Sequence, residues 1–109
     1  MNTSIAIDGR IVSLRKSLYR GNNRLALRFV DITDGAPYAT LTVNIPDAEL
    51  KEGEFLVKTW GGNEELASLA IQSGIFEDTG RRVRENFVEA QVWRFKDPDA
   101  LRHIRNWRI

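Results

Sequence analysis

Hydrophobic and polar residues alternate along several short stretches of the chain, a pattern typical of β-strands with one buried face. In the segment 24–32, Leu25, Leu27 and Phe29 fall on one face of the predicted strand. The segment 38–45 alternates over eight residues and is the strongest strand signal in the chain. Strands are also predicted at 5–7, 11–19, 55–60 and 87–95.

Turn and capping residues separate these strands. Asp8-Gly9 favours a two-residue hairpin turn. Asn63 is a good N-cap for a helix that Gly74 would end in the left-handed conformation. Asp97-Pro98 favours the start of a short terminal helix over roughly 98–107. We therefore expect an α+β fold: an antiparallel sheet of about six or seven strands, a meander followed by a later hairpin, with one central and one C-terminal helix.

The composition is that of one ordinary globular domain. The chain has 109 residues, of which 42% are hydrophobic and 28% charged, so we expect a single domain over 1–109 with a helical C-terminal extension over 96–109. It has no cysteine, which excludes disulfides, thiolate metal sites and cysteine nucleophiles. The N-terminus lacks a secretory pattern, and no run approaches the ~20 apolar residues of a membrane span. We expect a cytoplasmic protein that does not bind membranes.

Charge is segregated along the chain although the net charge is only +1. Residues 1–30 carry six Arg and Lys against Asp8, a net charge of +5. Residues 31–80 carry two lysines against ten acids, a net charge of −8, and residues 81–109 carry eight Arg and Lys against four acids, a net charge of +4. Such segregation creates a basic face if the two ends fold together and cancels if basic strands pair beside acidic ones.

The tripeptide Asp-Thr-Gly at 78–80 is the one that carries the catalytic aspartate of aspartic proteases. A protease dyad requires two aspartates close together in mostly apolar surroundings. Glu77 precedes the tripeptide and two arginines follow it, so burial would be costly, and Arg81 would keep Asp78 ionised. The sequence predicts instead a tight hairpin over 75–83, with Gly80 at positive φ at its tip.

Other candidate sites also favour structural interpretations. Gly61-Gly62 precedes a helix, but Glu64 and Glu65 at its start would repel a phosphate. His103 is the only histidine, so a structural zinc site that needs about four ligands cannot be built. The acids between 47 and 54 lack the glycine and spacing of a calcium loop and are expected to form a solvated acidic surface. We expect no catalytic residues, cofactor or metal ion.

Two charged sets remain as candidates for binding. The acidic set would contact a basic protein, and consists of Asp47, Glu49, Glu52, Glu54, Glu64, Glu65, Glu77 and Asp78. The basic set would contact nucleic acid, with Trp107 beside it, and consists of Arg81, Arg82, Arg84, Arg94, Arg102, Arg105 and Arg108.

Several motifs, taken in order, resemble an uncharacterised family of small bacterial proteins: NRLALRFVDITDGAPYATLTVNIPD, FLVKTW, NEEL, EDTGRRV and FVEAQVWRF. Its members are carried on conjugative plasmids, integrative elements and phages, sometimes as one module of large multi-domain proteins. The resemblance covers roughly residues 20–95 and departs at Gly61-Gly62 and in the arginine-rich tail. The matching residues include Asn44, Lys58, Trp60, Asn63, Glu64, Asp78, Thr79 and Gly80.

The resemblance implies a setting on mobile genetic elements and no established activity. In that setting we expect a small non-enzymatic accessory protein, monomeric or homodimeric, that binds a host protein or ribonucleoprotein. An antagonist of restriction or CRISPR-type immunity is the leading interpretation. The alternative is a nucleic-acid-binding accessory protein that uses the arginine-rich C-terminal segment.

Overall fold

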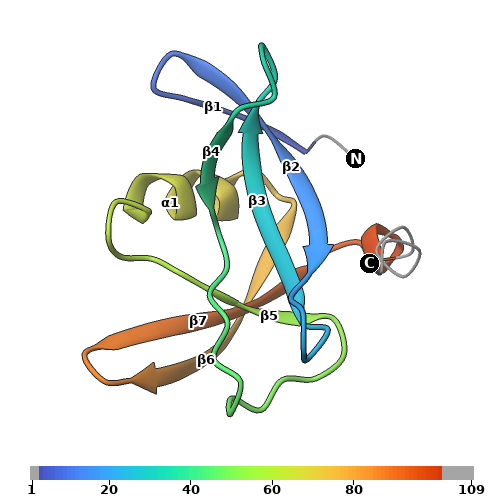
Figure 1. The fold of residues 1–109 in the computed structure, drawn as a ribbon, viewed down its shortest axis with the longest axis vertical. Helices are drawn as coiled ribbons and strands as arrows, with labels where there is room; N and C mark the ends of the chain where they lie inside the picture. Colours follow the sequence, from blue (N-terminus) through green and yellow to red (C-terminus); the bar gives the residue numbers. More distant parts are fainter. Residues whose placement is uncertain (1–2, 102–109) are drawn as a thin grey trace.

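The computed structural model describes residues 3–101, which form seven strands, one α-helix and one short 3-10 helix (Figure 1). The chain order is β1 (Ser4–Ile7), β2 (Arg10–Leu18), β3 (Leu25–Asp31), β4 (Pro37–Thr40), β5 (Glu54–Val57), α1 (Glu64–Gln72), β6 (Phe76–Glu85), β7 (Val88–Phe95) and η1 (Pro98–Leu101). All strand pairs are antiparallel. The predicted α+β class and number of strands are confirmed, but the strands form two sheets rather than one.

Sheet A has the strand order β1-β2-β3-β4, and sheet B has the order β5-β7-β6. Sheet A begins with the predicted hairpin, in which Asp8 and Gly9 have φ angles of 52° and 70°. Two positive φ angles match the right-handed twist of the paired strands, and Gly9 adopts its angle without strain. The alternation over 24–32 is also confirmed, because Leu25, Leu27 and Phe29 are all buried.

The long strand predicted over 38–45 is wrong, because β4 ends at Thr40 and the chain then crosses to sheet B. The N–H of Leu41 still donates to the C=O of Leu27 in β3 (2.8 Å), but its own C=O accepts from the N–H of Lys58, just after β5 (2.8 Å). Val43 N–H then donates to Leu56 C=O (3.1 Å). The two sheets are therefore joined through the backbone of one segment.

Thr42 closes the gap that this crossing leaves in sheet A. The C=O of Leu41 is taken by Lys58, so the N–H of Leu27 donates instead to the Thr42 hydroxyl (3.1 Å). The same hydroxyl lies 2.9 Å from the hydroxyl of Tyr19. A hydroxyl can donate one hydrogen bond and accept two, so a single buried side chain serves both neighbours. Thr42 thus replaces a backbone acceptor where β4 departs.

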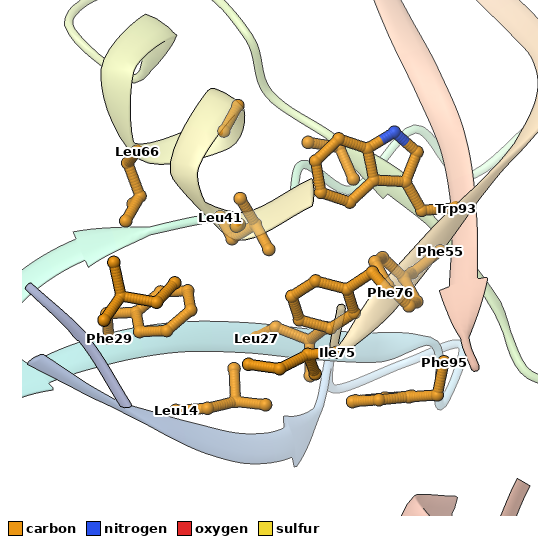
Figure 2. Packing of buried hydrophobic residues seen from close by; sticks show 14 of the residues in the cluster. Leu14, Leu27, Phe29, Leu41, Phe55, Leu66, Ile75, Phe76, Trp93 and Phe95 are labelled. Atoms are coloured by element: carbon orange, nitrogen blue, oxygen red, sulfur yellow. The ribbon is translucent and has the colours of Figure 1, made fainter. Parts of the chain in front are cut away.

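The main core lies between the inner face of sheet A, the inner face of sheet B and α1 (Figure 2). Four aromatic rings make its sheet B side: Phe76 lies 5.1 Å from Phe95, 5.5 Å from Phe55 and 5.8 Å from Trp93, measured between ring centroids. A second, smaller cluster covers the other face of sheet B and consists of Ile45, Ala48, Leu56, Ala90 and Val92. Sheet B is therefore covered on both faces.

Helix α1 packs on the core through Leu66, Ala67 and Ala70. Gly74, at a φ of 84°, follows it as predicted. Asn63 occupies the N-cap position, but the predicted side-chain cap is wrong. Its amide instead donates to the C=O groups of Thr40 (2.7 Å) and Lys58 (3.3 Å). These two hydrogen bonds tie the end of β4 to the segment that follows β5, and they satisfy the amide N–H donors of Asn63, which is buried.

The hairpin predicted over 75–83 is wrong. Residues 76–85 form one strand, β6, and the chain reverses at Asn86 and Phe87, where Glu85 pairs with Val88. The Asp-Thr-Gly tripeptide lies in a bulge between Asp78 and Arg82, where the register against β7 shifts. A bulge and a hairpin turn both need residues that accept unusual φ angles, which is why the local sequence did not distinguish them.

The predicted C-terminal helix is confirmed only at its beginning. The Asp97 carboxylate accepts a hydrogen bond from the N–H of Asp99 (2.9 Å), as a capping residue does, and Pro98 opens η1. Lys16 of β2 donates to the C=O of Ala100 (3.1 Å), which fastens η1 to sheet A. Arg102, His103, Arg105, Trp107 and Arg108 lie outside the described residues.

Replacing Thr42 by valine tests the junction. Thr42→Val keeps the volume but leaves the buried N–H of Leu27 without an acceptor, which should cost about 1–3 kcal/mol of unfolding free energy in urea denaturation. Tyr19→Phe removes the other partner of the same hydroxyl and should cost less, about 1 kcal/mol. Equal losses in the two variants would contradict the assigned role.

Candidate functional site

Sheet B carries a network of ion pairs on the face opposite its aromatic core. Arg81 Nη1 lies 2.6 Å from Glu54 Oε1, and its Nη2 donates to the C=O of Glu49 (2.6 Å). Arg94 pairs with Glu77 directly across from it on β6. Arg94 also stands opposite Glu54 on β5, so Glu54, Arg94 and Glu77 form one row across the sheet, and Arg81 reaches Glu54 from the bulge in β6. Arg81 is therefore a structural residue that fastens the segment before β5.

A second set of ion pairs lies on the other face of the β6–β7 hairpin. The guanidinium of Arg82 makes two bonds to the Asp78 carboxylate, at 2.9 and 2.8 Å. Arg84 lies 3.9 Å from Glu89, its cross-strand partner. Every described arginine of the predicted nucleic-acid set is therefore paired with a carboxylate. The expectation that Arg81 keeps Asp78 ionised is wrong, because Arg82 is the arginine that pairs with the Asp78 carboxylate.

Glu54 does not belong to a solvated acidic surface, since it has 7% relative exposure. Burial alone would raise the pKa of Glu54, but the N–H of Lys51 and the guanidinium of Arg81 bond to its carboxylate and bring the pKa below its ordinary value. The Arg82 guanidinium likewise lowers the pKa of Asp78. Both acids are held ionised by partners within the protein.

The structure does not gather the predicted acidic set into one surface. Asp47, Glu49 and Glu52 are exposed in the acidic loop, residues 46–53, which precedes β5. Glu64 and Glu65 are exposed at the start of α1, beyond the other end of β5 (Figure 1). The remaining three, at 54, 77 and 78, are paired with arginines.

The acidic loop is held by two arginines that bond its backbone carbonyls. Arg24 donates to the C=O groups of Ile45 (2.8 Å), Pro46 (3.2 Å) and Ala48, and Arg81 donates to that of Glu49. Guanidinium groups carry five N–H donors in a rigid fork, so one arginine can satisfy several carbonyls of a turn. The loop is thus ordered by basic residues from both the N-terminal and C-terminal thirds of the chain.

The Asp-Thr-Gly bulge is saturated with local hydrogen bonds. The hydroxyl of Thr79 donates to the C=O of Val92 (2.7 Å) and accepts from the N–H of Arg81 (3.2 Å). Asp78 accepts from the N–H of Gly80 (2.9 Å) as well as from Arg82. Gly80 has a φ of 87°, so the predicted positive angle is confirmed although the hairpin tip is not.

Phe87 is the functional candidate that sequence reasoning missed. It occupies the tip of the β6–β7 hairpin with a relative exposure of 105%, and the hairpin extends away from sheet A (Figure 1). The sequence placed it as the first residue of a strand because its apolar side chain fits the alternation of 87–95. Asn86, at a φ of 54°, was the available signal, because asparagine tolerates the left-handed angle of a turn.

Two further findings concern the described residues only. Among residues 3–101, no group of three or more His, Cys, Asp or Glu is placed to hold a metal ion. Within that same part of the chain, no helix has the length and apolar character needed to span a membrane.

Comparison with known proteins adds no relative: no family model, curated protein or solved structure matches the chain. The resemblance to the family carried on mobile elements stays a prediction. Several of its matching residues are structural here, since Asn63 ties the end of β4 to the segment after β5 and Thr79 bonds across the bulge.

The bulge predicts a specific response at Gly80. A Cβ there would meet no atom within 4 Å, so we expect the cost of substitution to come mainly from its φ of 87°. Gly80→Val should lose about 1–3 kcal/mol of stability in chemical denaturation, and Gly80→Asn should lose less because asparagine tolerates such angles. An asparagine variant as unstable as the valine variant would contradict this explanation.

The paired carboxylates predict that stability falls in acid. A folded-state pKa below the ordinary 4.5 of Glu54 means that its contribution is present above that pH and is lost as pH falls through the folded pKa. Glu54→Gln should therefore flatten the decline of Tm below about pH 4.5. Glu49→Gln, at an exposed position, is the matched control and should leave the decline unchanged.

Proposed function

We propose that this protein acts by binding another macromolecule through the tip of the β6–β7 hairpin. The observation that carries the proposal is the full exposure of Phe87 at that tip. Large aromatic side chains are the residues around which the binding energy of protein interfaces concentrates. An apolar ring that is left in water by the folded chain gains most when a partner's pocket covers it.

The hairpin is well suited to present such a side chain. Pairs Asp78–Arg82 and Arg84–Glu89 lie along one of its faces, and Glu77–Arg94 lies on the other. Each exposed pair adds little stability, but together they restrain long side chains along the hairpin, and Arg84–Glu89 is the pair nearest the tip. A restrained surface loses less conformational entropy on association, so more of the contact energy appears as affinity.

The resemblance to proteins of mobile elements supplies the class of partner. We propose a host protein or ribonucleoprotein, and a restriction or CRISPR-type defence complex is the specific class to test. The acidic loop and the start of α1 provide exposed carboxylates for basic surfaces of such a partner. Nucleic-acid binding through Arg81, Arg82, Arg84 and Arg94 receives less support, since each is neutralised by a carboxylate.

The experiment adds a purified defence complex to a bacterial lysate, captures it on the immobilised protein, and then measures the Kd of the purified complex for the protein. Phe87→Ser should weaken that Kd by roughly thirtyfold or more, because truncation of an anchor residue costs about 2 kcal/mol or more. Ile32→Ser is the matched control, since Ile32 is also an exposed apolar residue, at 55% relative exposure, but lies outside the hairpin.

The two variants distinguish the possible outcomes. Loss of binding in Phe87→Ser with an unchanged Tm supports the hairpin as the contact. Equal loss in both variants, or full binding by Phe87→Ser, would show that another surface makes the contact.

A further inference from the structure

The outer face of sheet A carries a pair of arginines that the fold does not neutralise. Strand alternation places Ser13, Arg15 and Ser17 of β2, and Ala26 and Arg28 of β3, on the side away from the main core. Arg15 and Arg28 stand directly opposite each other, and Thr40 of β4 continues the row beside Arg28. Arg15, Arg28 and Thr40 are all exposed.

This arrangement is unfavourable for the isolated protein. Residues directly opposite in antiparallel strands have Cβ atoms about 4.5–5.5 Å apart, and like charges at that separation destabilise the sheet. Arg15 donates only to Ser13 Oγ and the C=O of Leu14, both at 3.2 Å, and neither is charged. No ion pair in the described part of the chain includes Arg15 or Arg28.

The strands of sheet A contain one acidic residue among those described, and it lies on the other face. Asp31 stands in register with the buried Val12 and pairs with Arg10 at 3.5 Å. The contrast with sheet B is direct, since each arginine of β6 and β7 has a carboxylate partner. Arg15 and Arg28, two of the six basic residues among the first thirty, therefore lie on the outer face of sheet A without a carboxylate partner.

We propose that the outer face of sheet A binds the phosphate backbone of nucleic acid through Arg15 and Arg28. Guanidinium groups bond phosphates with two parallel N–H donors, and neighbouring serine and threonine hydroxyls, such as Ser13, Ser17 and Thr40, are common phosphate donors. A duplex carries one negative charge per ~1.7 Å of its axis, so its phosphates are dense enough to contact both adjacent arginines at once. Binding would relieve the repulsion that the free protein retains.

The face also indicates which features of the nucleic acid are read. Arg15, Arg28 and Thr40, the exposed residues on which the site is built, include no aromatic ring on which unpaired bases could stack, and Tyr38 of β4 packs against the main core. Recognition is therefore of the backbone and independent of sequence. This site is separate from the hairpin of the proposed function and does not depend on it.

The test is fluorescence anisotropy with labelled DNA and RNA duplexes of about 20 base pairs, between about 50 and 200 mM salt. The double variant Arg15→Ala, Arg28→Ala should weaken binding about tenfold or more, and should reduce the slope of log K against log salt by about two. The matched control is Arg82→Ala, Arg84→Ala, which removes the same charge from paired arginines and should stay within about twofold of the unchanged protein.

A second variant separates binding from folding. Arg28→Glu places a carboxylate opposite Arg15, so it should raise Tm while it abolishes duplex binding. A structural defect would lower both together, and that result would overturn the proposal.

Three other results would also overturn it: no duplex binding by the unchanged protein at low salt, equal loss in the Arg82, Arg84 control, or competition by poly-glutamate as effective as that by duplex at equal charge. The last would show that the face prefers acidic protein to phosphate. Phe87→Ser should bind duplex normally, so failure of the hairpin proposal would leave this one standing.

Discussion

The architecture depends on the two backbone hydrogen bonds of a single residue, Leu41. Its N–H belongs to sheet A and its C=O belongs to sheet B, so the position of one sheet is set by the other. The aromatic cluster around Phe76 then fills the space that this connection encloses. Because a buried polar group must find a partner, the crossing is possible only where the Thr42 hydroxyl satisfies the N–H that β4 abandons.

The same physical device recurs in sheet B. At the Asp-Thr-Gly bulge the register against β7 slips, and the hydroxyl of Thr79 donates to the C=O of Val92. Thr42 acts as an acceptor where the chain leaves sheet A, and Thr79 acts as a donor in the bulge of sheet B; a hydroxyl can do either. Both irregularities therefore occur at threonines because each interrupted ladder needs one side-chain partner close to the backbone.

The sequence predicted what depends on local pattern and missed what depends on register. Alternation located the strands around Leu27 and Val92 because it reports which side chains are buried. It did not reveal the break after Thr40, since residues 39, 41 and 45 are apolar whichever layer they face, and Leu41 and Ile45 belong to different clusters. The ion pairs could not be predicted from the sequence either, because Arg94 lies beside Glu77 only through the register in which β7 pairs with β6.

The bulge has a consequence for how the molecule behaves at high concentration. Strand β6 lies at the edge of sheet B, where unpaired backbone groups can recruit a strand from another molecule and seed aggregates. Six of its ten residues are charged, and the bulge at Gly80 bends it out of the straight form that a neighbour could extend. The Asp-Thr-Gly stretch, which resembles half of a protease active site, thus gives this edge strand features that disfavour pairing with a strand of another molecule.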